Sequence, residues 1–183
     1  MQIYEPAEDS FLLAKCIKNL AKTILKNNKE ASFLDMGTGS CIQSQTALKC
    51  GFKKKNILAS DINNNAVQNA KNKGFKAINS NLFRKINERY DLIAFNAPYL
   101  PYSRYDSNKD TCGGKKGYET SLKFIRGLKK HLKEGRRALL LISTLTSPDV
   151  IEKELKNLDF SFKKAAFEKT FFEEIIVLEI RKT

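Results

Sequence analysis

The stretch YDLIAFNAPY, residues 90–99, joins an apolar run to groups that could hold an amino group. The apolar run predicts a buried strand that ends at Asn96, and Pro98 keeps Ala97 extended, with its carbonyl pointing outward. The side-chain oxygen of Asn96 and the Ala97 carbonyl could then accept both hydrogens of one flat amino group. Tyr99 offers an aromatic face beside them. A turn-forming asparagine ahead of a proline is the structural alternative.

Two acceptors in this arrangement suit a nitrogen whose lone pair is delocalised into an amide or an aromatic ring. Hydrogen bonds to both N–H groups turn the lone pair toward an electrophile and stabilise the positive charge that develops on nitrogen. An asparagine is preferable to an aspartate when the donor of the transferred group is already a cation. The motif therefore indicates group transfer to an amide or ring amino nitrogen.

Gly37 and Gly39 follow another apolar run, within DMGTGS at 35–40. Glycines at this spacing allow a tight turn with positive φ and let a ligand approach the backbone closely. A dinucleotide fingerprint needs a third glycine at position 42, where this chain has Ile42, so NAD binding is disfavoured. A simple turn from a strand into a helix is the alternative.

Asp61 closes the next apolar run, ILASD, about twenty residues after the glycines. A carboxylate here can accept two hydrogen bonds from a ribose diol, although it could instead cap the following helix. A ribose acceptor beside a glycine turn without the pyrophosphate pattern fits a nucleoside that carries no diphosphate. S-adenosylmethionine meets this description. Its sulfonium makes the methyl group electrophilic, so the protein needs only to hold a nucleophile in line with the methyl–sulfur bond.

Strands that alternate with helices must position these groups. We expect helices near 7–27, 43–50, 63–74, 118–133 and 147–158, and strands in SFLDMG, NILASDI, FKAINS, YDLIAFN and RRALLLIS. Two closing strands are expected in FSFKKAAFEKTF and FEEIIVLEIRK. This order predicts an α/β fold: one Rossmann-like domain over residues 1–183, with a doubly wound, mostly parallel seven-stranded sheet and a C-terminal antiparallel hairpin. Ligands of such sheets bind beyond the carboxyl ends of the strands.

Composition limits the functional classes. No apolar stretch approaches the length of a membrane span, and the amino terminus lacks the features of a signal peptide, so we expect a cytoplasmic protein. Four cysteines without a CxxC pair and one histidine, His131, argue against a metal site in this chain. A net charge of +13 makes contact with nucleic acid or a ribonucleoprotein plausible. The lysines are scattered, however, as they are in chains that reflect genome base composition.

The stretches YEPAEDSFLL, DMGTGS, SDIN, NAPYLP and GGKKGYE carry a resemblance that extends over nearly the whole chain. The chain resembles the HemK-type glutamine methyltransferases, which are class I S-adenosylmethionine-dependent enzymes. Within them it is most similar to the short archaeal and eukaryal branch that methylates the glutamine of the GGQ tripeptide in class I translation release factors. The resemblance implies a class I methyltransferase domain, and N-methylation of that side-chain amide.

The resemblance also implies roles for individual residues. It implies that Ser10 contacts the cofactor, that Asp35 and Gly37 line its methionine part, and that Asp61 binds its ribose. Asn81 and Leu82 would flank the adenine, and Asn96–Tyr99 would hold the target amide. The branch works as a heterodimer with a small zinc-binding activator protein, and it contacts nucleic acid only indirectly. We expect FKAINS to lie at one edge of the sheet, where unpaired backbone groups invite this partner. Its lysines could instead simply protect the edge.

Four positions depart from the family pattern. Ala97 stands in place of a proline, Asn81 in place of an aspartate, Cys41 in place of a glycine, and Lys116 where an acidic residue is common. The backbone carbonyl at Ala97 survives its change, and Asn81 can still accept a hydrogen bond, although without charge. We interpret CGGKKGYE as a mobile lid over the target.

Two other functions compete with glutamine methylation. An adenine amino group in DNA or RNA is also conjugated, so Asn96 would serve an adenine methyltransferase equally well. The chain has no additional domain to grip duplex DNA or flip a base, which counts against that function. A non-catalytic binding module on the same sheet is the second alternative.

Overall fold

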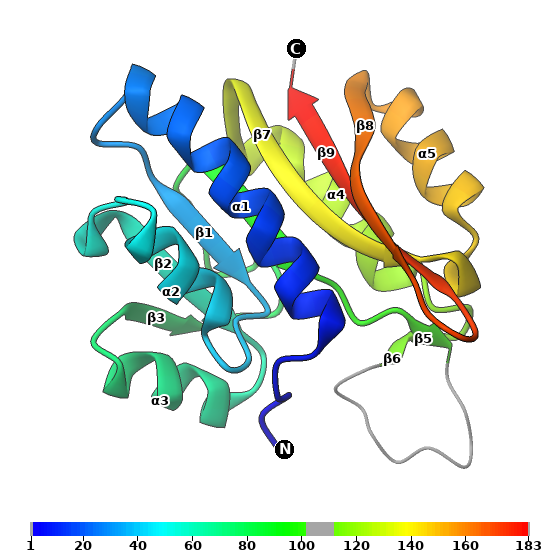
Figure 1. Cartoon of the computed structure of the whole chain (residues 1–183), viewed down its shortest axis with the longest axis horizontal. Helices are drawn as coiled ribbons and strands as arrows, with labels where there is room; N and C mark the ends of the chain where they lie inside the picture. Colours follow the sequence, from blue (N-terminus) through cyan, green and yellow to red (C-terminus); the bar gives the residue numbers. More distant parts are fainter. Residues whose placement is uncertain (1, 102–111, 183) are drawn as a thin grey trace.

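Seven strands form one twisted sheet in the order β3-β2-β1-β4-β7-β9-β8 (Figure 1). The computed structural model describes residues 2–101 and 112–182. The strands are β1 (Phe33–Met36), β2 (Ile57–Asp61), β3 (Lys76–Asn79), β4 (Tyr90–Asn96), β7 (Leu132–Ser143), β8 (Phe160–Lys169) and β9 (Glu174–Lys182). The first five pair in parallel, whereas β9 runs antiparallel to both β7 and β8. The predicted mostly parallel sheet with a closing hairpin is confirmed, and β3 lies at one edge as expected.

Five α-helices of the described residues pack against the two faces of this sheet. They are α1 (Glu8–Asn27), α2 (Ile42–Lys49), α3 (Asn64–Asn72), α4 (Glu119–His131) and α5 (Pro148–Asn157). Shorter elements are the 3-10 turns η1 (Lys54–Asn56) and η2 (Thr144–Thr146), and a parallel pair of strands, β5 (Leu100–Pro101) and β6 (Cys112–Gly114). Within the described residues, no helix has the length and apolar character to cross a membrane.

Helices α1 to α3 cover one face and α4 and α5 the other, so the sheet has a core on each side (Figure 1). Successive strand residues point to opposite faces. In β4, Leu92 and Ala94 therefore join the core under α1, whereas Ile93 and Phe95 join the core under α4. All four are at most 3% exposed. The continuous apolar run of β4 is thus explained by burial on both faces.

Two predicted boundaries were wrong in detail. The helix expected over 118–133 ends at His131, and β7 begins at Leu132, which pairs with Tyr90. An irregularity in the register follows and contains Gly135 at a φ of 69°. Ser147 is the N-cap residue of α5, and its side chain makes no capping hydrogen bond.

Contacts with Asp91 account for the early end of helix α4 and the early start of β7. This carboxylate is only 1% exposed and accepts hydrogen bonds from the backbone and hydroxyl of Ser32, both at 2.9 Å. Lys133 reaches it at 2.6 Å and Arg136 at 3.2 Å, both from the irregular part of β7. Burial alone would raise the pKa of Asp91, but the bonds from Lys133 and Ser32 outweigh it and lower the pKa.

We expect Asp91→Asn to lower the free energy of unfolding by about 2 kcal/mol at pH 7, because it leaves two cations without their shared anion. The estimate is below that for a fully buried pair, because both cations are partly exposed. The lowered pKa means that this contribution is present above the ordinary carboxyl pKa and is lost as pH falls through the lowered value. Urea unfolding at pH 7 and pH 3 measures the difference. Glu30→Gln, which breaks an exposed ion pair with Lys53, is the control, and an equal effect of the two changes would contradict the role of Asp91.

Candidate functional site

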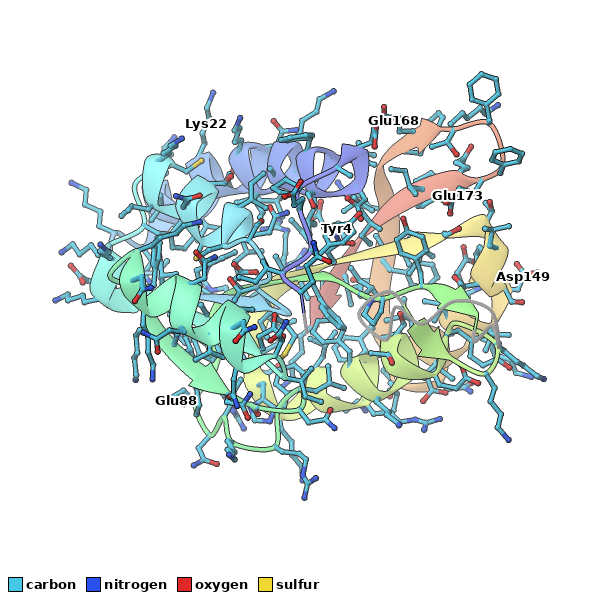
Figure 2. The ribbon with its side chains drawn as sticks, turned by 90° about the horizontal axis from the view of Figure 1, so that it is seen from below. Tyr4, Lys22, Glu88, Asp149, Glu168 and Glu173 are labelled. Atoms are coloured by element: carbon cyan, nitrogen blue, oxygen red, sulfur yellow. The ribbon has the colours of Figure 1, made fainter. Side chains whose placement is uncertain are left out.

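Three parallel strands end level with one another at the carboxyl edge of the sheet. Met36 of β1 pairs with Ser60 of β2 and with Phe95 of β4, so the residues that directly follow these three along the chain lie side by side. These next residues are Gly37, Asp61 and Asn96. Strand order reverses between β1 and β4, which is the point where ligands bind in open α/β sheets. Figure 2 views the molecule from below this edge, and Tyr4 lies near the centre of the view.

The glycine turn has the predicted conformation. Gly37 and Gly39 have φ values of 62° and 47°, in the left-handed region that favours glycine. A Cβ atom at Gly37 would lie 3.0 Å from a ring carbon of Phe95, so the turn also needs glycine in order to pack on β4. At Gly39 the nearest atom to an added Cβ would be 3.8 Å away, the carbonyl oxygen of Tyr4. Cys41 follows with a φ of 74°, which accounts for a glycine being the usual residue there.

Asp35 is the buried carboxylate of this turn. It is 1% exposed and accepts hydrogen bonds from the hydroxyls of Thr38 and Ser44, each at 2.7 Å, and from the Ser44 backbone at 2.9 Å. Burial raises the pKa of Asp35 to about 6, against the lowering effect of these bonds. The carboxylate is therefore ionised at neutral pH and adds negative charge beneath the turn.

Asp61 fixes the turn from the neighbouring strand. Its Oδ2 accepts a hydrogen bond from the Gly39 backbone at 2.9 Å, and its Oδ1 accepts one from the Asn63 backbone at 2.8 Å. The alternative that Asp61 caps α3 is wrong, because Asn63 caps this helix and accepts a bond from the Asn65 backbone at 2.9 Å. Contact of Asp61 with a ribose stays a prediction.

Asn81 and Leu82 follow β3 in a tight turn at the same edge. The Ser80 hydroxyl donates to the Leu82 carbonyl at 2.8 Å, and Leu82 has a φ of 49°. The backbone of Ser80 in turn donates to the carbonyl of Asp61 at 2.9 Å. Leu82 packs partly into the core under α4, whereas Asn81 is exposed. The structure thus brings both residues beside Asp61, and their contact with adenine stays a prediction.

Asn96 has one end of its amide held and the other end without a partner. Its Nδ2 donates to Asp9 Oδ2 at 2.9 Å, whereas its Oδ1 is buried and has no hydrogen-bond partner within the described structure. Ala97, directly after it, is 1% exposed. Tyr99 packs against the core under α1, and burial, followed by the negative charge of Asp9, raises the pKa of its hydroxyl. A buried acceptor without a partner is costly and therefore points to a ligand.

Asp9 is the functional residue that sequence reasoning missed. It lies in the first turn of α1 and is 5% exposed, and it also accepts a hydrogen bond from the Tyr4 hydroxyl at 3.1 Å. The Ser10 hydroxyl donates to its other oxygen at 3.1 Å, and the Ser10 carbonyl accepts a bond from Gln43 at 2.9 Å. The available signal was an acidic residue within YEPAEDSFLL, next to a helix face that is otherwise apolar. Contact of Ser10 with a cofactor stays a prediction.

The interpretation of CGGKKGYE as a mobile lid does not fit its contacts. Residues 112–114 pair with β5, which directly follows Tyr99. A side chain at Gly113 would collide with the carbonyl oxygens of Pro98 and Gly117, so this stretch packs tightly against the turn that carries the site. The backbone of Lys116 donates to the Glu119 carboxylate at 3.0 Å. These contacts make the stretch a support for the Pro98 turn.

Comparisons with known proteins agree with this geometry. The family model described as ribosomal protein L11 methyltransferase (PrmA) matches residues 13–96. A candidate protein N5-glutamine methyltransferase of Methanocaldococcus jannaschii is 37% identical, and the match covers 97% of this chain and 90% of that protein. A release factor glutamine methyltransferase of Agrobacterium fabrum is 32% identical over 52% of this chain, and the match spans about a third (36%) of that protein.

Among solved structures, a chain of the Mtq2-Trm112 complex of E. cuniculi superposes with a TM-score of 0.80 and 21% identity, and the match covers 100% of each chain. That complex is responsible for methylation of the eRF1 translation termination factor. At this identity the likeness concerns the fold, which is the Rossmann-like class I methyltransferase fold. The match to the M. jannaschii protein, over nearly the full length of both chains, decides the family. This chain belongs to the protein N5-glutamine methyltransferase family of enzymes.

Proposed function

We propose that this enzyme transfers a methyl group from S-adenosylmethionine to the side-chain amide nitrogen of the GGQ glutamine in a class I translation release factor. The observation that carries the proposal is the Asn96 amide, whose nitrogen is bonded to Asp9 while its oxygen is buried without a partner. An amide N–H of the target can supply the missing bond. The names of the relatives support the choice of glutamine.

The residues at the carboxyl edge fit the proposed cofactor. The Gly37–Gly39 turn has no side chains at its two glycines, so a ligand can approach the backbone there. Asp35 places a buried negative charge beneath that turn. We assign the methionine part to Asp35 and Gly37, the ribose to Asp61, and the adenine to Asn81 and Leu82. Bound S-adenosylmethionine would supply an electrophilic methyl group on a cationic sulfur.

The protein's own residues then orient the nucleophile. Asn96 Oδ1 accepts one N–H of the glutamine amide, and the Ala97 carbonyl accepts the other, so that the nitrogen lone pair faces the methyl group. With the cofactor bound, the oriented nitrogen would accept the methyl group, and the electron pair of the carbon–sulfur bond would stay on sulfur. One amide proton then leaves to solvent. Asp9 prevents rotation of the Asn96 amide, which would otherwise present N–H groups to the N–H groups of the target.

We infer that the exposed edge of the sheet at β3 binds a small zinc-binding activator subunit, to form a heterodimer. β3 pairs with β2 on one side and is the terminal strand of the sheet. Its unpaired backbone groups can add a strand from another chain. The likeness to a chain of a two-protein complex supports this inference. We further propose that residues 1–183 act as one methyltransferase domain in the cytoplasm.

The direct test is methyl transfer from labelled S-adenosylmethionine, with and without the activator, to release factor or to adenine-containing nucleic acid. We expect one methyl group on the side-chain nitrogen of the GGQ glutamine, located by fragmentation mass spectrometry. Label in adenine and none in the glutamine would establish the nucleic-acid alternative. Binding of the cofactor without transfer to any substrate would favour a binding module.

We expect Asn96→Ala to lower kcat by about 10²- to 10³-fold, the usual loss for one donor or acceptor aligned to transition-state charge. Asp9→Ala should lower kcat by about tenfold or more, because the amide of Asn96 is then free to rotate. Both variants should keep the cofactor dissociation constant within about threefold.

A double-mutant cycle separates positioning from simple destabilisation. Asp9→Ala should have no further effect on kcat in the Asn96→Ala background, because Asp9 acts through that amide. Tyr4→Phe removes a different bond to Asp9 and serves as the matched control, with a small expected effect. Additive losses in the double variant would contradict the proposed role of Asp9.

Asp61→Ala should raise the dissociation constant of S-adenosylmethionine by about a hundredfold, because the ribose loses an anionic acceptor and the Gly39 backbone loses its bond. Calorimetry measures this constant without any activity assay. S-adenosylhomocysteine, which has the same ribose, should lose affinity by the same factor. An unchanged constant would remove the ribose assignment.

Affinity for S-adenosylmethionine should fall as pH drops below about 6, the pKa to which burial raises Asp35. The ionised carboxylate attracts the cationic methionine part, so binding requires loss of the proton and weakens by about fivefold between pH 6 and pH 5. Asp35→Asn should bind weakly at every pH in this range, with a flat profile. A wild-type profile as flat as that of the variant would contradict the assignment.

A further inference from the structure

The turn between β8 and β9 carries two phenylalanines that contact almost nothing. Phe171 is 100% exposed and Phe172 is 91% exposed, with ring centroids 6.5 Å apart. We call residues 170–173 the aromatic tip. Isolated apolar side chains at a surface are ordinary, but two adjacent and fully exposed aromatic rings are typical of interaction sites.

The backbone beneath the aromatic tip is fixed from two sides. Thr170 N donates to the Glu173 carbonyl at 2.8 Å, which closes the turn. Ser143, at the end of β7, donates its hydroxyl to the Glu173 carboxylate, and the Glu174 backbone donates to the Thr144 hydroxyl at 2.9 Å. The two rings are therefore presented on a braced turn, which lowers the entropy lost when they bind a partner.

Strand register places the aromatic tip beside the target site. Asn96 pairs with Leu141 of β7, which pairs with Val177 of β9, so Asn96 and Val177 lie level and two strands apart. Two strand spacings correspond to about 10 Å, and the strand residues from Val177 to Glu174 extend about 10 Å beyond that level. The tip follows Glu174 and therefore projects past the carboxyl edge that carries Asn96. Figure 2 shows Glu173 at this projecting hairpin, to one side of Tyr4.

Contacting elements link the site to the tip. Tyr99 leads directly into β5, β5 contacts η2, and η2 contacts β9 below the tip. Leu145 of η2 is 48% exposed and lies along this path. The edge strand β3 lies at the other end of the sheet order, so the tip is separate from the proposed activator edge.

We propose that the aromatic tip docks into an apolar depression on the folded protein that carries the target glutamine. This inference rests on the proposed function. A glutamine preceded by two glycines offers few side-chain atoms to bind, so the energy that holds it in place must come from remote contacts. A protein substrate reaches a contact more than about 10 Å beyond the site, whereas a short peptide around the glutamine does not.

The test compares Phe171→Ser/Phe172→Ser with wild type on two substrates: intact release factor, and a short peptide containing the GGQ glutamine. We expect kcat/KM for the intact protein to fall about thirtyfold, the size of a loss of about 2 kcal/mol at an interface anchor. The value for the peptide and the dissociation constant of S-adenosylmethionine should stay within about twofold. Phe167→Ser, a 55% exposed phenylalanine on the stem of the same hairpin, is the matched control and should resemble wild type on both substrates.

Equal kinetics of the double variant and wild type on the intact protein would overturn the proposal. An equal loss on both substrates would also overturn it, since that places the effect at the reaction centre. A second measurement uses Asn96→Ala enzyme and calorimetry with intact release factor, where the tip substitutions should weaken binding by the same factor. If the tip instead joins two copies of the chain or holds the activator, the tip substitutions change the sedimentation of the enzyme or its activator complex and leave release factor binding unchanged. Absence of glutamine methylation by wild type would refute the proposed function itself, and is distinct from all these outcomes.

Discussion

The bond between Asn96 and Asp9 joins two parts of the chain that are 87 residues apart in sequence. One partner ends a buried parallel strand, and the other begins the long helix that covers the same face of the sheet. The bond can form only if β4 and α1 are packed in register, so the chemistry of the site depends on the core beneath it. Asp9 is itself almost fully buried, and the hydroxyls of Tyr4 and Ser10 hold its carboxylate in place, which makes the orientation of the Asn96 amide well defined.

The same edge shows how a parallel sheet gathers groups that are distant in sequence. Gly37, Asp61 and Asn96 lie side by side because β1, β2 and β4 have matching registers, and none of the three positions is close to another along the chain. The bond from the Gly39 backbone to Asp61 then ties the first turn to the second strand. A change that displaces Asp61 at the end of β2 would therefore also disturb the glycine turn that follows β1.

The sequence predicted most of this arrangement, because strand ends and glycine spacing are local signals. The order of strands and helices and the left-handed turn at Gly37 and Gly39 follow from patterns within about ten residues. The edge position of β3 follows from the strand order that is typical of doubly wound sheets. Asp9 could not be assigned a role in this way, because that role depends on a contact with Asn96, 87 residues away in sequence. The early start of β7 was missed for a similar reason: residues 132 and 133 were predicted as the end of a helix and the strand only from residue 136, whereas Lys133 and Arg136 contact the buried Asp91 on another strand.

Charge is distributed in a way that bears on the choice of substrate. The chain carries a net charge of +13, yet Asp9, Asp35 and Asp61 bring three carboxylates to the edge where the reaction is proposed. Negative charge there suits a cofactor with a cationic sulfur and opposes the close approach of phosphate groups. A nucleic acid would have to bring its backbone near this edge in order to present an adenine, whereas a protein loop of glycines and a glutamine brings no charge. The acidic site thus favours an amide over a nucleobase as the target.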